Sequence, residues 1–229
     1  MSGSVISLRD IQTIVRNYPP KFQPTRIESL GAAGGMSGAQ FWRIESSVGP
    51  LILRRWPTEH PSGEQLRFIH DVLFYAAGRG VSFVPAPVRT VLGESITQTG
   101  GHLWQLEPRM PGEADYDRAP NAQKLRAAMT ALAQFHVATS DFPTVQPPQG
   151  VAVPPAIARR LARLNELPIT GVARLGGAIS SQILPSLEPL AHQFLVTLPL
   201  LLPTALRQLE SLARNHFVMQ PCIRDIWHD

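Results

Sequence analysis

The spacing of apolar residues changes near the middle of the chain. Before residue 108, short segments in which apolar and polar residues alternate predict β-strands at residues 26–30, 40–45, 51–56, 88–91, 94–98 and 102–107. Two segments of the same region have the three- and four-residue spacing of an amphipathic helix, residues 7–16 and 64–79. After residue 118 this spacing predicts helices at residues 121–139, 156–166, 180–198 and 204–215. Strands followed by a run of helices indicate an α+β fold.

Proline and glycine residues separate the two regions. Pro108, Pro111 and Gly112 interrupt the chain directly after the last predicted strand. We therefore expect a β-rich first lobe at residues 1–107, a hinge or connector at residues 108–118 and a helical second lobe at residues 119–229.

Composition narrows the class of protein. The 229 residues, 44% of them hydrophobic, can bury a sizeable core. The single cysteine, Cys222, excludes a disulfide scaffold and a multi-cysteine zinc site.

The N-terminal residues lack the pattern of a secretory signal. The most apolar run, residues 194–206, is too short to span a bilayer and contains Pro199 and Pro203. We expect a cytoplasmic, soluble protein in which this run forms a buried, broken helix; no membrane partner is expected, and the oligomeric state is left open.

A glycine-rich segment joins the first two predicted strands. It contains Gly34, Gly35, Ser37 and Gly38. Dinucleotide- and mononucleotide-binding loops join a strand to a helix, so this strand–loop–strand context is different. Such a loop can lie over nucleotide phosphates, where missing side chains let main-chain N–H groups approach. An ordinary β-hairpin remains the alternative.

The third predicted strand ends in two arginines, Arg54 and Arg55. Because successive side chains of a strand point to opposite faces, only one of them can face the glycine-rich segment. An arginine there could hold phosphate oxygens through two hydrogen bonds, although two solvated charges would look the same in the sequence. On the following predicted helix, the polar residue nearest the apolar stripe is His70 rather than a carboxylate.

The last residues of the sequence contain a second candidate for chemistry. Asp225 follows an apolar pair and begins a polar, aromatic segment. An aspartate in a loop beside a binding cleft can accept the proton of a hydroxyl group or orient it for attack on a phosphate. His228 and Asp229 are too few ligands for a metal site, so we predict none.

The order of these segments resembles the aminoglycoside phosphotransferase and choline kinase-like family, which consists of small-molecule kinases with a protein-kinase-like fold. The resemblance covers nearly the whole chain. It rests on the strand–glycine loop–strand of residues 30–44, Leu-Ile-Leu-Arg at 51–54, Val-Pro-Ala-Pro at 84–87, Leu-Glu-Pro-Arg-Met-Pro-Gly at 106–112, Leu-Ala-Gln-Phe-His at 132–136, and Ile-Arg-Asp at 223–225 in the place of His-Gly-Asp.

The resemblance implies ATP-dependent phosphorylation of a hydroxyl group on a small molecule, with Mg²⁺ as the metal. It places adenine against the main chain near Glu107 and Arg109. The main chain of the glycine-rich segment would cover the phosphates through Gly34, Gly35, Ser37 and Gly38. Arg54 would take the place of the usual strand lysine, and Asp225 would be the catalytic aspartate.

The chain also departs from the family pattern. Both lysines lie outside the third strand, His70 stands near the place of the helix carboxylate, and Ile223 replaces the histidine of the catalytic loop. The metal-binding residues that follow the catalytic aspartate lie beyond Asp229, so the ligands for Mg²⁺ are missing from this sequence. We therefore expect a chain truncated at the catalytic loop, incomplete or inactive as written.

Two alternatives remain open from the sequence. A non-catalytic pseudokinase that binds a nucleotide or a partner would also lack the lysine, the helix carboxylate and the metal ligands. A basic nucleic-acid-binding protein is suggested by the pI of about 9.8, but the net charge is only +4 and no nucleic-acid-binding motif is present. We therefore expect no nucleic-acid partner.

Overall fold

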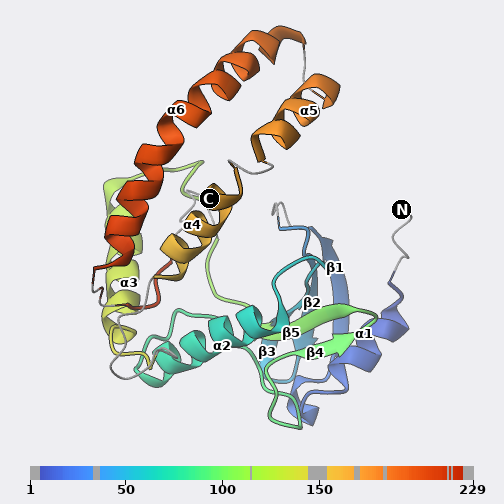
Figure 1. The fold of residues 1–229 in the computed structure, drawn as a ribbon. Helices are drawn as coiled ribbons and strands as arrows, with labels where there is room; N and C mark the ends of the chain where they lie inside the picture. Colours follow the sequence, from blue (N-terminus) through green and yellow to red (C-terminus); the bar gives the residue numbers. More distant parts are fainter. Residues whose placement is uncertain are drawn as a thin grey trace. The chain divides into compact units, whose positions relative to one another are not determined.

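The computed structural model describes residues 6–32, 37–113, 115–143, 154–167, 171–182, 185–215, 217 and 219–223. The chain divides into two compact units (Figure 1). The first contains Met1–Phe142 together with Gln220–Asp229, and the second contains Pro143–Met219.

A five-stranded antiparallel sheet forms the centre of the first unit. Its strand order is β1-β2-β3-β5-β4. The strands are β1 (Arg26–Gly31), β2 (Gln40–Ser46), β3 (Gly49–Arg55), β4 (Thr97–Thr99) and β5 (His102–Pro108). The predictions at residues 26–30, 40–45, 51–56 and 102–107 are confirmed to within two residues at each end. The sheet and the helices around it confirm the α+β class.

The strand predicted at residues 88–91 is wrong, and the one at 94–98 shrinks to β4. Pro85 and Pro87 have no N–H to donate to a ladder. The main chain that follows is instead held by scattered bonds, from Val88 N–H to the Leu106 carbonyl (2.7 Å) and from Val91 N–H to the Asn17 carbonyl (2.8 Å).

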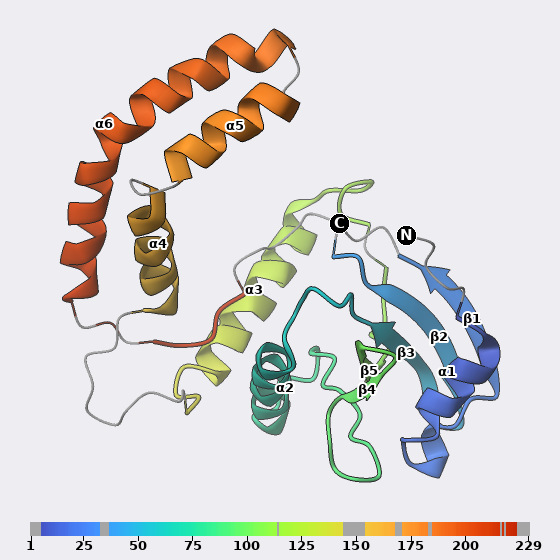
Figure 2. The ribbon, with the colours of Figure 1, turned by 45° about the vertical axis from the view of Figure 1, so that its right-hand side comes forward.

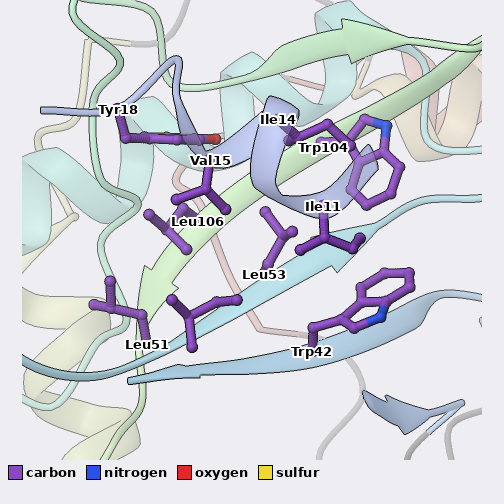
Figure 3. Packing of buried hydrophobic residues seen from close by; sticks show 10 residues of the cluster. Ile11, Ile14, Val15, Tyr18, Trp42, Leu51, Leu53, Trp104 and Leu106 are labelled. Carbon is purple, nitrogen blue, oxygen red and sulfur yellow. The ribbon is translucent and has the colours of Figure 1, made fainter. Parts of the chain in front are cut away.

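The helix α1 (Leu8–Val15) covers one face of this sheet (Figure 3). Ser7 caps it with a side-chain oxygen that accepts the Asp10 N–H. The indole rings of Trp42 and Trp104 pack together beneath it, with their centroids 5.4 Å apart. The buried cluster consists of Ile11, Ile14, Val15, Tyr18, Trp42, Ile44, Leu51, Leu53, Trp104 and Leu106. Trp42 and Ile44, two residues apart on β2, share this buried face, as the alternation of a strand requires.

The opposite face of the sheet contacts helix α2 (Gly63–Gly78), since His70 of α2 reaches Gln105 of β5. Ser62 and Gln65 form a capping box at its first turn. Leu66, His70, Val72 and Ala76 are buried. The three- and four-residue spacing also predicts Ile69 on the apolar stripe of this helix, and this part of the prediction is wrong, because Ile69 is 45% exposed.

The cap at Ser62 gives a first testable prediction. Ser62→Ala should lower the free energy of unfolding by about 1 kcal/mol, because the Gln65 N–H loses its acceptor. Ser62→Asp keeps an acceptor and should remain close to the wild type. Urea unfolding followed by circular dichroism measures both, and equal losses in the two variants would contradict the role of the cap.

Helix α3 (Ala122–Ala138) begins after its cap Asn121 and packs against the end of α2 (Figure 2). Phe135 of α3 joins Val72 and Ala76 of α2 in a second buried cluster. Past the end of α3, Asp141 accepts hydrogen bonds from Tyr75 of α2 (3.0 Å) and from Arg79, which directly follows α2 (2.7 Å). These contacts tie α3 to the lobe that contains the sheet.

The second unit is helical. It contains α4 (Pro155–Glu166), α5 (Val172–Gln182) and α6 (Glu188–Ala213), and a short 3₁₀ turn, η3 (Pro185–Leu187), precedes α6. A further turn, η1 (Pro20–Phe22), belongs to the first unit. Helix α6 contacts both α4 and α5.

The prediction of a buried, broken helix at residues 194–206 is wrong. One helix of 26 residues runs through Pro199 and Pro203, and Leu202 is its buried residue. Each proline removes a single main-chain hydrogen bond, and the leucine-rich turns around it remain helical. By length and composition alone α6 could cross a membrane, with a mean hydropathy of 1.3, which by itself is a weak indication.

Candidate functional site

Arg54 and Arg55 lie on opposite faces of β3, as strand geometry requires. Arg55 lies over the Trp104 ring, 6.0 Å from its centroid, on the face that α1 covers. Arg54 lies on the face toward α2, where its Nη2 is 3.0 Å from Oε1 of Glu107. The two side chains thus lie on opposite faces, whereas the expectation that one of them faces the glycine-rich segment stays a prediction, because residues 33–36 lie outside the described residues.

The guanidinium group of Arg54 lies against two aromatic rings. Its Cζ is 4.9 Å from the centroid of Phe41 and 4.9 Å from that of Trp56. Its Nε is buried and has no hydrogen-bond partner among the described residues. The side chain is nevertheless 28% exposed, so part of it is open to solvent.

Glu107 is the anion that holds this cation. Its side chain is only 8% exposed. Oε1 accepts from Arg54, and Oε2 accepts from the side-chain amide of Gln105. Burial raises the pKa of the Glu107 carboxyl above its usual value, and Arg54 acts against that rise.

His70 is fully buried beneath the sheet. Its Nδ1 lies 2.9 Å from the Ser95 hydroxyl, and its Nε2 lies 3.1 Å from Oε1 of Gln105. Burial lowers the pKa of the imidazole. The residue in the place of the expected helix carboxylate therefore contacts β5 and not Arg54.

Sequence reasoning missed Gln105, Ser95 and Trp56. The alternation along β5 held a usable signal, because Gln105 and Glu107 are two residues apart and must share a face. Their contacts with α2 depend on how the helix packs, which the local sequence does not specify.

The glycine-rich segment enters β2 next to Arg54. Phe41 is paired with Arg54 in the register of β2 and β3. Gly38 has a φ of +69°, and a Cβ there would lie 3.8 Å from Pro57. Ser37 accepts the N–H of Ala39 through its hydroxyl (3.4 Å). The predicted residues Gly34 and Gly35 lie outside the described residues.

At the start of the connector after β5, the main chain already forms a hydrogen bond within the protein. Arg109 is exposed, and its N–H donates to the Pro50 carbonyl at 3.0 Å. Pro108 has no N–H. A purine base beside these residues would therefore have to use carbonyl groups or the N–H groups that follow.

Asp225 lies outside the described residues, but the segment before it is held by α3. The Ile223 N–H donates to Nε2 of His136 at 3.3 Å. Pro221, Cys222 and Ile223 also line an apolar cavity of about 520 Å³ together with residues of α2 and α3. Within the described residues, no group of three His, Cys, Asp or Glu side chains could hold a metal ion.

Comparison with known proteins gives one family match. The model of the phosphotransferase enzyme family matches residues 30–167. The homoserine kinase of Janthinobacterium sp. (strain Marseille) is 31% identical over 117 residues, which cover 51% of this chain and 34% of that protein. The homoserine kinase of Cupriavidus taiwanensis is 29% identical over 123 residues, which cover 52% of this chain and 35% of that protein. The match thus spans about a third of the length of these curated relatives.

Two solved structures are also similar in part. An aminoglycoside phosphotransferase from Alicyclobacillus acidocaldarius aligns with a TM-score of 0.49 and 16% identity, over 92% of this chain and 55% of that one. An amicoumacin kinase in complex with AMP-PNP and Ca²⁺ aligns with a TM-score of 0.48 and 16% identity, over 76% of this chain and 53% of that one.

Proposed function

The chain belongs to the phosphotransferase enzyme family, and on this basis we propose that it is an ATP-dependent phosphotransferase acting on a hydroxyl group of a small molecule. The observation that carries this proposal is the placement of Arg54. Its side chain is partly exposed, lies on β3 next to the turn that enters β2, and forms an ion pair with the buried carboxylate of Glu107. A guanidinium group so oriented can bind phosphate oxygens through paired N–H bonds.

The residues present fit the phosphates of a nucleotide. ATP would supply the phosphoryl group that is transferred. The exposed part of Arg54 would bind phosphate oxygens, and the base would lie beside the main chain of Glu107 and Arg109. Main-chain N–H groups near the phosphates would come from Gly34, Gly35, Ser37 and Gly38. Asp225 would accept the proton of the substrate hydroxyl or orient that hydroxyl.

Magnesium belongs to the reaction that the family membership implies, but the described residues do not provide a site for it. In this proposal residues 1–107 form the nucleotide-binding lobe, residues 108–118 the hinge and residues 119–229 part of the helical lobe of a soluble, cytoplasmic protein. Homoserine is the first substrate to test, because the curated relatives are homoserine kinases.

A second candidate is a pseudokinase that binds a nucleotide without transferring phosphate. Two observations favour it. Arg54 is already paired with Glu107, and no metal-binding group is found within the described part of the chain.

Calorimetry and phosphoryl-transfer assays separate the two candidates. The 229-residue chain and a version extended to the length of the curated relatives are titrated with ATP, with and without Mg²⁺. Each is then assayed for phosphate transfer to homoserine and to a panel of other small hydroxyl compounds. Magnesium-dependent transfer by either chain supports the phosphotransferase. Binding without transfer in both supports the pseudokinase, and failure of both chains to bind ATP contradicts both proposals.

A further inference from the structure

A chain of buried side chains connects helix α2 to Arg54. It runs from His70 on α2 to Gln105 and Glu107 on β5 and ends at Arg54 on β3. Gln105 and Glu107 are both buried, so their polar groups depend on partners within the protein. Helix α2 is thus connected to Arg54 on β3 through hydrogen bonds of two β5 side chains, and not through a direct ion pair.

The orientation of the Gln105 amide is fixed by a group that can only donate. The indole N–H of Trp56 donates to Oε1 of Gln105 at 2.8 Å. The amide nitrogen therefore points the other way, toward Oε2 of Glu107. An amide held at its oxygen can direct its N–H at the carboxylate without rotating.

The same constraint fixes the tautomer of His70. Since Oε1 of Gln105 is an acceptor, Nε2 of His70 must carry the proton and donate to it. Nδ1 is then the acceptor for the Ser95 hydroxyl. A neutral imidazole satisfies both bonds, in agreement with the lowered pKa of His70.

We propose that Gln105 is a positioning residue for the phosphate-binding cation: it orients Glu107, which in turn holds Arg54 in the slot between Phe41 and Trp56. That Arg54 binds phosphate rests on the proposed function, but the positioning of Arg54 can be measured without any nucleotide. In the family pattern the carboxylate that holds the strand cation lies on the helix, whereas here the carboxylate is Glu107 on β5.

The test compares three variants with the wild type. Gln105→Leu keeps the volume but removes all three hydrogen bonds of the side-chain amide, those with Trp56, His70 and Glu107. Gln105→Glu keeps the shape and donates to Glu107 only while its carboxyl is protonated. Gln98→Leu is the matched control, because Gln98 is exposed on the neighbouring strand β4.

The first readout needs no ligand. Proton–nitrogen NMR, assigned with Arg54→Lys, should show a distinct and slowly exchanging guanidinium signal for Arg54 in the wild type and in Gln98→Leu. That signal should be lost in Gln105→Leu. A signal that persists unchanged in Gln105→Leu would overturn the proposal.

The second readout is the pH dependence of ATP affinity in Gln105→Glu. The charged and titratable groups around this position are His70 on α2, Arg54 on β3 and Glu107 on β5, with Asp71 and Arg89 acting on His70 from further away. Two carboxyl groups that share a buried site retain one proton to a raised pH. The shared proton restores donation to Glu107, so the ATP affinity of this variant, relative to the wild type at the same pH, should rise by about tenfold from pH 8 to pH 6. The Arg54 signal should return over the same range.

The outcomes separate the two proposals. If the Arg54 signal follows position 105 but the wild type does not bind ATP, the positioning role stands and the proposed function fails. If ATP binds and neither the signal nor the affinity responds to Gln105→Leu and Gln105→Glu, the positioning role fails and the function stands. Should Gln105→Leu not fold, as judged by circular dichroism, the comparison of Gln105→Glu at the two pH values decides alone.

Discussion

Replacing Arg54 with methionine should lower the free energy of unfolding at pH 7 by about 3 kcal/mol, because it leaves a buried carboxylate without its cation. The Glu107 side chain is 8% exposed and would keep the Gln105 amide as its remaining partner. Methionine retains most of the apolar stem that lies between Phe41 and Trp56. The loss therefore reports the charge and not the packing.

The effect should depend on pH with a defined sign. Burial already raises the pKa of Glu107, and Arg54 opposes that rise, so removing Arg54 raises this pKa further. An acid whose folded-state pKa lies above its unfolded value binds more protons when folded. The destabilisation should therefore shrink as the pH falls from 7 toward 5, as measured by urea unfolding at each pH.

Arg43→Met is the control for this experiment. Arg43 pairs with Glu45 on β2 at 2.6 Å, but both side chains are more than a third exposed. Such a pair contributes about 0–1 kcal/mol, so this variant should change little and show no comparable pH dependence. An Arg54→Met variant that behaves like Arg43→Met would show that Glu107 does not depend on Arg54.

Asp225→Asn should lower kcat for phosphoryl transfer by about 10³-fold while ATP affinity stays unchanged. The expected reason is that an amide cannot accept the proton of the attacking hydroxyl, although it keeps the size of the carboxylate. The measurement uses whichever of the two chain lengths transfers phosphate, with ATP affinity taken from calorimetry.

Asp117→Asn is the matched control, since Asp117 is exposed and lies outside the proposed site. It should keep full turnover. Undiminished turnover in Asp225→Asn, or an equal loss in both variants, would remove Asp225 from the reaction.

Local patterns in the sequence predicted most of the sheet and the separation of Arg54 from Arg55. Both follow from the two-residue repeat of a strand, which the sequence displays directly. The same repeat placed Trp42 and Ile44 in the core beneath α1. Family resemblance then supplied the order of the segments, which spacing alone could not.

The contacts around Arg54 could not be predicted in the same way. Glu107 is 53 residues away from Arg54 in the sequence, and Gln105 is 35 residues away from His70. Such pairings depend on strand order and on how α2 packs. The prediction at residues 194–206 is wrong for a different reason, because the strongly helical residues around Pro199 and Pro203 outweigh the two prolines. The continuous α6 shows that two missing bonds need not end a helix of this composition.

Three contacts hold Trp56 beside Arg54, so its fluorescence can report what binds to that cation. Its carbonyl oxygen lies 2.8 Å from Nδ1 of His102, its indole N–H donates to Gln105, and its ring lies against Arg54. Trp42 and Trp104 are sealed within the core on the other face of the sheet. Any anion that draws the guanidinium group away from its ring should change the emission of Trp56 more than that of those two. Fluorescence of the unlabelled protein, compared with a Trp56→Phe variant, would then follow the occupancy of Arg54 in real time.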